Sequence, residues 1–276
     1  MPNVPHHKPR SSAMFTRLTL AAAVLLFAVV PAVARTPEEK GLAIAKEVDR
    51  RDLGWGDSAT ALEMILSNSQ GQTSTRELRS LNLEVNGDGL GDRSLTIFDR
   101  PRDVAGSAFL SHTKITEADD QWLYLPALKR VKRISSANKS GPFMGSEFAY
   151  EDLLSQEVAK YTYRWLRDEP CGELRCFVVE RFPVYENSGY TRQVVWVDTT
   201  EYRFMKIDFY DRKESLLKHL VYSDYRQYLG KYWRAHKMVM TNRQTGKGTT
   251  LNFSDYQFQT GIKETAFTPD RLKRVR

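Results

Sequence analysis

The sequence lacks the short motifs that mark most zinc proteases, serine hydrolases and nucleotide-binding proteins. It contains no His-Glu-x-x-His, no Gly-x-Ser-x-Gly and no glycine-rich phosphate loop. His112, His219 and His236 are far apart and lie within strand-like runs, so we expect packing or surface roles for them. A three-histidine metal site or an envelope hydrolase would require these residues to converge in space. We therefore predict a protein that is not an enzyme and that needs no metal or cofactor.

Cysteine is scarce as well, with two residues in the whole chain. Cys171 and Cys176 are separated by four residues, a spacing that suits a disulfide closing a hairpin turn in an oxidising compartment. A redox site more often has two intervening residues, and a zinc site needs further ligands. We therefore predict a structural disulfide.

No hydrophobic run is long enough to cross a bilayer, which takes roughly 20 residues. Leu18–Val30 is nearly all apolar, and Ala32-Val33-Ala34 follows it as a small-x-small cleavage pattern. The residues before the run are basic: Lys8, Arg10 and Arg17. We predict that residues 1–34 are a cleaved signal peptide and that the protein is periplasmic in a Gram-negative bacterium. A retained signal anchor is the alternative.

The chain has no strong excess of charge once this segment is removed. Its formal net charge is +7, and cleavage would take away three basic residues. A mildly basic secreted protein is a poor candidate for nucleic-acid binding. We predict no nucleic-acid partner.

What the sequence has is β-structure. It contains 13 Tyr, 13 Phe and five Trp, residues that favour strands. Alternating apolar and polar runs separated by short turns continue from residue 73 to residue 259. We expect helices at residues 37–50 and from Asp57 or Ser58 through Leu66. The pattern predicts one domain, residues 35–276, in which some ten antiparallel strands form a curved sheet or partly closed barrel with the helices against one side.

The strands carry more large apolar side chains than a single sheet with two helices needs to cover. Tyr163 and Trp165 share one face of a strand, and Trp196 and Phe209 belong to later strands. Core packing would explain any one of these residues. Their sum favours an internal cavity, and we predict that these four residues contribute to its wall.

The stretch from Trp122 to Leu154 is the most distinctive part of the chain. A strand with Trp122 and Tyr124 on one face and Leu125 on the other is followed by a basic run that includes Arg130 and Arg133. A bulky apolar group then follows, made of Phe143, Met144 and Phe148. One interpretation is an edge hairpin with a short helix that caps the core. The other is a mobile apolar lid at the mouth of a cavity for an acidic amphiphile, with the arginines meeting head groups or a partner.

This stretch, Trp122–Ile134 with Phe143–Asp152, resembles the outer membrane lipoprotein-sorting protein family. Asp49–Asp57 and Phe267–Leu272 extend the resemblance over most of the chain. The resemblance implies a LolA/LolB-like fold, an incomplete antiparallel barrel of about ten or eleven strands with helices as a lid over a hydrophobic cavity. It implies a periplasmic carrier that shields the acyl chains of lipoproteins. Because relatives are associated with RND-type lipid exporters, another membrane lipid such as a hopanoid is a rival cargo, and an accessory module docking to such an exporter is a rival function.

Overall fold

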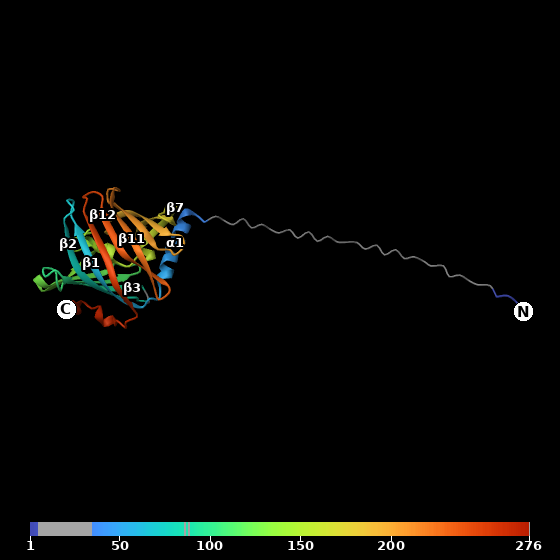
Figure 1. The fold of residues 1–276 in the computed structure, drawn as a ribbon, viewed down its shortest axis with the longest axis horizontal. Coiled ribbons are helices and arrows are strands. Elements are labelled where there is room, and N and C mark those ends of the chain that lie inside the picture. The colour runs from blue at the N-terminus through green and yellow to red at the C-terminus, as the bar shows by residue number, and fades with distance from the viewer. Residues whose placement is uncertain (5–34, 86, 88, 276) are drawn as a thin grey trace. The chain divides into compact units, whose positions relative to one another are not determined.

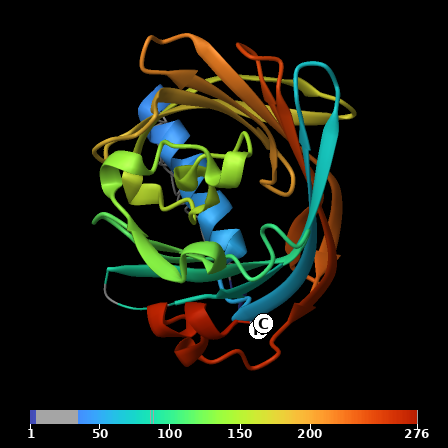
Figure 2. The ribbon, with the colours of Figure 1, turned by 90° about the vertical axis from the view of Figure 1, so that its left-hand side faces the viewer.

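The fold is built on one sheet that curves around its own interior (Figures 1 and 2). The computed structural model describes residues 1–4, 35–85, 87 and 89–275. Residues 5–34, most of the predicted signal peptide, lie outside the described residues, and residues 35–276 form one compact unit. The helix and the first six strands are α1 (Pro37–Asp52), β1 (Asp57–Ser67), β2 (Thr73–Leu83), β3 (Leu90–Arg100), β4 (Ala108–Lys114), β5 (Asp120–Leu125) and β6 (Arg130–Ile134). The remaining strands are β7 (Tyr161–Cys171), β8 (Leu174–Pro183), β9 (Tyr190–Asp198), β10 (Phe204–Asp211), β11 (Leu216–Tyr228), β12 (Tyr232–Asn242) and β13 (Gly248–Phe258).

All 13 strands belong to a single antiparallel sheet that does not close. Their order is β6-β5-β4-β3-β2-β1-β13-β12-β11-β10-β9-β8-β7. Each strand thus pairs with its neighbours in sequence, except that β1 pairs with β13 and leaves β6 and β7 as the two edges. The predicted half-open barrel is confirmed, with 13 strands where about ten or eleven were expected.

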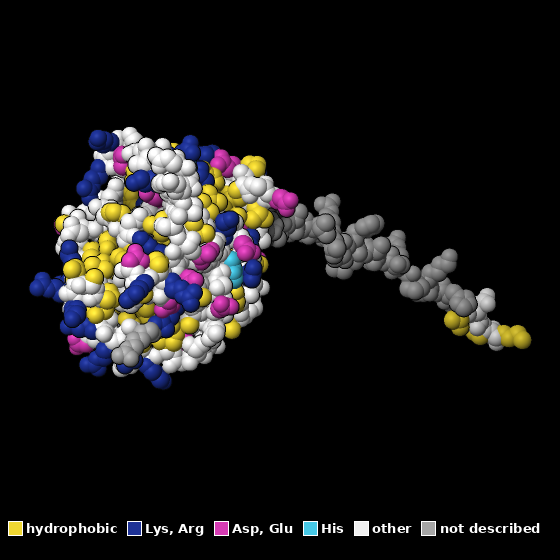
Figure 3. Space-filling view, turned by 60° about the vertical axis from the view of Figure 1, so that its left-hand side comes forward, with side chains coloured by type: hydrophobic (Ala, Val, Ile, Leu, Met, Phe, Trp, Pro, Cys, Tyr) yellow, Lys and Arg dark blue, Asp and Glu magenta, His cyan; other side chains and the backbone are white. Residues whose placement is uncertain are grey.

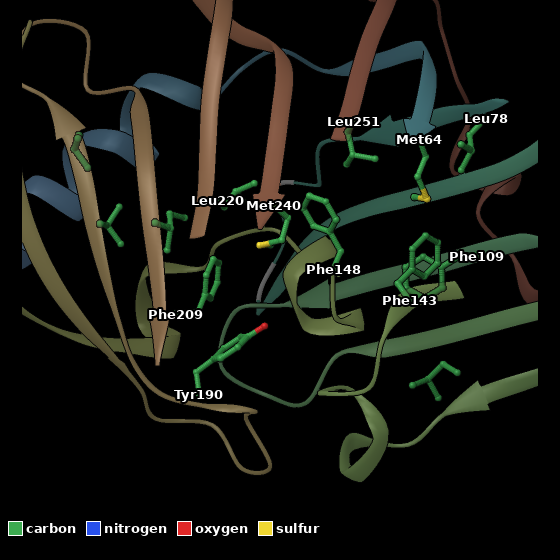
Figure 4. Close-up of a cluster of buried hydrophobic side chains, with 14 of the residues drawn as sticks. Met64, Leu78, Phe109, Phe143, Phe148, Tyr190, Phe209, Leu220, Met240 and Leu251 are labelled. Carbon is green, nitrogen blue, oxygen red and sulfur yellow. The ribbon is translucent and has the colours of Figure 1, made fainter. Parts of the chain in front are cut away.

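The connection between the two edge strands lies inside the curve of the sheet (Figure 2). We call residues 135–160 the inner segment; it contains four short 3-10 helices, η2 (Ser136–Asn138), η3 (Phe143–Gly145), η4 (Tyr150–Leu153) and η5 (Val158–Lys160). Its aromatic side chains pack against the inner face of the sheet: the ring centroids of Phe143 and Phe109 are 5.2 Å apart. Figure 4 shows Phe143 and Phe148 among the buried side chains of the strands. The inner segment therefore fills part of the barrel interior.

Helix α1 begins where the sequence predicts. Thr36 is its N-cap, with Oγ1 accepting from Glu39 N at 3.1 Å while Glu39 Oε2 accepts from Thr36 N at 2.9 Å. The helix packs along the edge strand β7, where Gly41 lies against the backbone: a Cβ at this position would be 2.8 Å from Trp165 N. The close approach is available because Gly41 has no side chain.

The second predicted helix is wrong, since residues 57–67 form strand β1. This strand is bonded to β2 on one side and β13 on the other. Its Met64 side chain is buried in the core. Asp57 does not cap a helix but accepts from Thr260 N at 2.8 Å and Gly261 N at 3.1 Å. Pairing on both sides of a central strand outweighs the helix propensity of its Ala, Leu and Met residues.

A smaller apolar cluster lies on the outer face of β3–β6. The C-terminal helix η7 (Pro269–Arg274) covers it (Figure 2, red). Phe267 and Leu272 are buried there against Leu95, Ile97 and Leu110, and Trp122 and Tyr124 pack at its margin. Alternate residues of β3–β5 thus serve two cores, one inside the sheet and one outside it.

Candidate functional site

A cavity of about 730 Å³ occupies the part of the interior that the inner segment leaves free. This volume falls within the range of small-molecule sites. Apolar lining comes from α1 (Ile44, Ala45 and Val48) and from the inner face of β8 and β9 (Val179, Val195 and Val197). Further lining comes from Leu53 and Trp55, from Glu84, Val85 and Gly87, and from residues 154–158 at the end of the inner segment.

The apolar walls arise from the period of two along the strands. In β8, Val179 and Arg181 point inward while Glu180 points outward, where it pairs with Arg192 at 3.1 Å. In β9, Val195 and Val197 are inward and almost fully buried. The chain thus builds a surface of branched aliphatic side chains on one side of the cavity, suited to a hydrocarbon chain.

Several carboxylates line the cavity, and they come from the end of α1, from the residue after β2, from the start of β3 and from the end of the inner segment. The lining includes Asp52, Glu84, Asp92 and Glu157. Burial raises the pKa of Glu157 to about 7, with a further contribution from the charge of Asp92. Burial likewise raises the pKa of Asp92 to about 6, against the hydrogen bond it accepts from Ser155 Oγ at 3.3 Å. The carboxyl groups of Asp92 and Glu157 therefore titrate closer to neutral pH than ordinary carboxyl groups do.

One cation faces the same space. Arg181 is 4% exposed and lines the cavity. Its Nε donates to Gln193 Oε1 at 2.7 Å, and its guanidinium carbon lies 4.6 Å from the centre of the Tyr161 ring. Nothing in the sequence distinguished this arginine from the others, because its burial depends on the register of β8 within the barrel.

The ten predicted ligand-binding residues do not lie together: they belong to the cavity lining, to the inner core, to the outer cluster or to none of these. Tyr163 lines the cavity, with its hydroxyl donating to Val158 O at 3.1 Å. Phe143, Phe148 and Phe209 are buried in the inner core, and Leu125 and Met144 pack against it. Whether these residues meet a ligand stays a prediction.

The three predicted tryptophans lie elsewhere. Trp122 packs with Tyr124 at the outer cluster. Trp165 donates through Nε1 to Asp168 Oδ1 at 2.7 Å, with Lys40 Nζ 3.5 Å from the centre of its ring. Trp196 donates through Nε1 to Glu169 Oε1 at 2.5 Å. The tryptophan among the residues lining the cavity is Trp55, which lies just after α1 and was not among the predicted ligand-binding residues.

The predicted basic pair lies on the edge strand β6, where Arg130 and Arg133 are exposed and Arg133 bonds Asp120. The predicted disulfide joins Cys171 to Cys176 across the β7–β8 turn, with a Cα–Cα distance of 5.8 Å. Figure 3 shows basic, acidic and apolar side chains interspersed over one face of the described surface.

The described residues contain neither a cluster of metal ligands nor a membrane-spanning helix. No group of three or more His, Cys, Asp or Glu side chains there is placed to hold a metal ion. The three predicted histidines are apart and have protein partners: His112 with Phe267 O, His219 with Asp208, and His236 with Tyr228 and Phe253. No helix in that part of the chain is long and apolar enough to span a bilayer.

The chain is similar to several proteins of known structure. A domain from Vibrio parahaemolyticus named for outer membrane lipoprotein sorting is 61% identical, with a TM-score of 0.83, and the match covers 86% of this chain and 100% of that one. A DUF1329 family protein from Desulfovibrio piger is 29% identical, with a TM-score of 0.82 and the same coverage. A LolA superfamily protein from Nitrosomonas europaea shares the fold at 20% identity, with a TM-score of 0.66 over 86% of this chain and 99% of that one.

A family model described only as that of an uncharacterized protein matches residues 91–274. No curated protein matches the chain.

Proposed function

Because this chain belongs to the family of outer membrane lipoprotein-sorting proteins, we propose that it is a periplasmic carrier that holds the hydrocarbon part of a lipid or lipidated protein inside its half-open barrel. The observation that carries the proposal is the cavity of about 730 Å³. Aliphatic side chains of β8 and β9 line this cavity. In a fully packed barrel, other side chains of the protein would fill the space next to them. Burying each methylene group there contributes roughly 0.8 kcal/mol.

The carrier needs no catalytic group. Its work is to remove acyl chains from water, at a free-energy gain of the order of 10 kcal/mol for one long chain before ordering costs. Release requires the cavity to open, and α1 is the element suited to move, because it packs along an edge strand and is not itself part of the sheet. We propose that α1, more than the buried Phe143 and Phe148, acts as the lid.

The test is native mass spectrometry of the protein purified from its own host. We expect a population carrying one additional mass that organic extraction identifies as lipid. Val195 lines the cavity and is 2% exposed, so Val195→Phe should reduce that population by filling the space. Val221→Phe is the matched control, since Val221 is 43% exposed on β11. A wild-type protein that carries and binds no lipid under any condition would refute the carrier.

A partner in the inner membrane would load or unload such a carrier. We propose that the exposed basic strand β6, with Arg130 and Arg133, contacts anionic head groups or an acidic surface of an RND-type exporter. An unpaired edge strand with cationic side chains is available for such a contact. Charge reversal at both arginines should abolish cross-linking to the exporter in cells while leaving lipid binding unchanged. Retention of cross-linking in the reversed variant would remove β6 from the interface.

A further inference from the structure

A row of inward-facing residues crosses the sheet from β7 to β11. Strand register places Tyr163 opposite Arg181, Arg181 opposite Gln193, Gln193 opposite Phe209, and Phe209 opposite Lys218. Two of these side chains are cations, and both are buried: Arg181 is 4% exposed and Lys218 is 3% exposed. A buried charge costs several kcal/mol unless it is paired, so each cation requires compensation.

Lys218 is compensated by the protein itself. Its Nζ lies 2.7 Å from Asp152 Oδ2 and donates to Glu147 O at 2.8 Å. Asp152 and Glu147 both belong to the inner segment. The ion pair therefore holds this segment against the wall of the barrel. Lys218 needs no ligand to balance its charge.

Arg181 has no such compensation. Its Nη2 is buried and has no hydrogen-bond acceptor among the described residues, and no ion pair joins Arg181 to a carboxylate in that part of the chain. Gln193 satisfies Nε, and the Tyr161 ring stacks against the guanidinium at 4.6 Å. Neither contact supplies a negative charge. The unpartnered Nη2 belongs to a residue that lines the cavity.

The carboxylates that line the cavity restrict where the acid group of a bound ligand can lie. Asp52, Asp92 and Glu157 line the part of the cavity near α1 and the β2–β3 connection, where they would repel a second negative group. Arg181 is the guanidinium among the lining residues, and the aliphatic wall of Val179, Val195 and Val197 lines the same cavity. An anionic amphiphile is thus best accommodated with its acid group on Arg181 and its hydrocarbon chain along this wall.

We infer that the cargo carries a carboxylate or phosphate group that pairs with Arg181 inside the barrel. This inference rests on the proposed carrier function and narrows it. The ligand class is an acidic single- or double-chain amphiphile that enters with its acid group inward, and a cargo whose acyl chains end only in neutral esters would leave Arg181 unpaired.

The experiment uses protein expressed from the full-length sequence, stripped of lipid and titrated at pH about 8, where a free carboxylic acid is ionised. Palmitic acid, hexadecyl phosphate and hexadecanol have the same chain length and differ in the head group. Intrinsic fluorescence reports binding, since Trp55 lines the cavity. We expect wild-type protein to bind at least one of the two anionic probes about tenfold to a hundredfold more tightly than the alcohol, as a charge-assisted hydrogen bond predicts.

The matched variants are Arg181→Met and Arg192→Met. Arg192 lies on β9 but pairs with Glu180 on the outer face. Arg181→Met should reduce the affinity for the anion to that for hexadecanol and leave hexadecanol binding unchanged, whereas Arg192→Met should keep the preference. The anionic probe that shows the Arg181-dependent preference identifies the acid group as carboxylate or phosphate.

The outcomes separate the two proposals. Equal wild-type affinities for all three probes would overturn the pairing with Arg181 and leave the carrier intact, and so would a preference that persists in Arg181→Met. Binding of none of the probes would count against the carrier itself. The wild-type comparison needs no variant, so it decides the question even if Arg181→Met fails to fold.

Discussion

The interior of the barrel has two regions, which differ in whether their buried charged groups have partners of opposite charge. Around the inner segment, two buried lysines have carboxylate partners: Lys218 pairs with Asp152 at 2.7 Å and Lys160 pairs with Asp119. Around the cavity, Arg181 has an unpartnered Nη2, and the carboxyl pKa values of Asp92 and Glu157 are raised. In the first region the protein itself supplies the opposite charge, whereas in the second no carboxylate of the described residues pairs with Arg181.

The difference shows which part of the interior serves the fold and which part serves a ligand. Buried ion pairs with additional hydrogen bonds hold a segment in one arrangement, and removing one partner is strongly destabilising. Desolvation of a buried cation that lacks a carboxylate lowers the stability of the empty protein, and its remaining hydrogen bond and ring contact offset that cost, so removing it should change the stability little. The comparison therefore predicts large effects on unfolding in the first region and small ones in the second.

The largest effect is expected at the ion pair of the inner segment. Asp152→Asn leaves the ammonium group of Lys218 buried without a carboxylate, which should lower the free energy of unfolding by about 3–5 kcal/mol. Denaturant unfolding followed by circular dichroism measures it. The control is Asp224→Asn, whose partner Arg226 is exposed and whose loss should stay below about 1 kcal/mol. Similar values for the two variants would contradict the assignment of the inner segment as part of the folded core.

The next effect concerns the contact of α1 with β7. Gly41→Val places a branched side chain against the Trp165 backbone, whose N atom would lie 2.8 Å from the new Cβ. We expect a loss of about 1–3 kcal/mol and faster hydrogen exchange confined to α1, because the helix must move off the edge strand. Leu42→Val is the control on the exposed face of the same helix. Exchange that accelerates equally in β11 and β12 would indicate global loosening and would exclude α1 as a separate lid.

Much of the fold could be predicted from the sequence because its signals are local. The capping box at Thr36, the alternation along β8 to β12 and the Cys171–Cys176 spacing each depend on a few neighbouring residues. The helix expected at Asp57–Leu66 failed for the converse reason. Its Ala, Leu and Met residues are good helix formers, and pairing with β2 on one side and with β13, almost two hundred residues later, on the other makes this segment a central strand.

The candidate site was less accessible to prediction. Tyr163 could be placed in the lining from its strand, but alternation alone does not say which face turns inward, so Trp196 was included although it bonds Glu169 outside the cavity. Arg181 carries no signal in the sequence. Arg181 stands out because no carboxylate of the described residues pairs with it, whereas Lys218 in the same row pairs with Asp152 of the inner segment. This contrast becomes visible only once the inner segment has folded into the barrel.

A smaller effect is expected from the carboxyl groups of the cavity. The pKa of Glu157 is raised from 4.5 to about 7 in the folded protein, so the folded state binds this proton more tightly than the unfolded state. The stabilising contribution is complete below pH 4.5 and is lost as the pH rises toward 7. Asp92 acts in the same direction between 3.8 and about 6.

Glu157→Gln removes this titration. Relative to wild type, the variant should become more stable as the pH is raised from about 5 to about 8, by on the order of 1 kcal/mol. Thermal melts across this range measure the difference, and Glu117→Gln, at a side chain that is 77% exposed, should show none. A difference that shrinks with rising pH would mean that Glu157 is stabilised as the anion, and the cavity would then not disfavour negative charge on that side.

The smallest effect on the empty protein, and the sharpest test of the comparison, is expected for Arg181→Met. Replacing a buried cation that lacks a carboxylate with an apolar side chain of similar length should change the free energy of unfolding by less than about 1 kcal/mol, because the lost hydrogen bond to Gln193 is offset by the lost desolvation penalty. Lys218→Met, three positions along the same row, should cost several kcal/mol because it leaves the Asp152 carboxylate buried without its cation.

The difference between Arg181→Met and wild type should then grow when a ligand is present. Saturating palmitic acid or hexadecyl phosphate should raise the melting temperature of wild-type protein through preferential binding to the folded state, and this gain should be largely absent from Arg181→Met. If Arg181→Met destabilises the lipid-free protein as much as Lys218→Met does, Arg181 is compensated within the chain after all, and the two regions of the interior do not differ in kind.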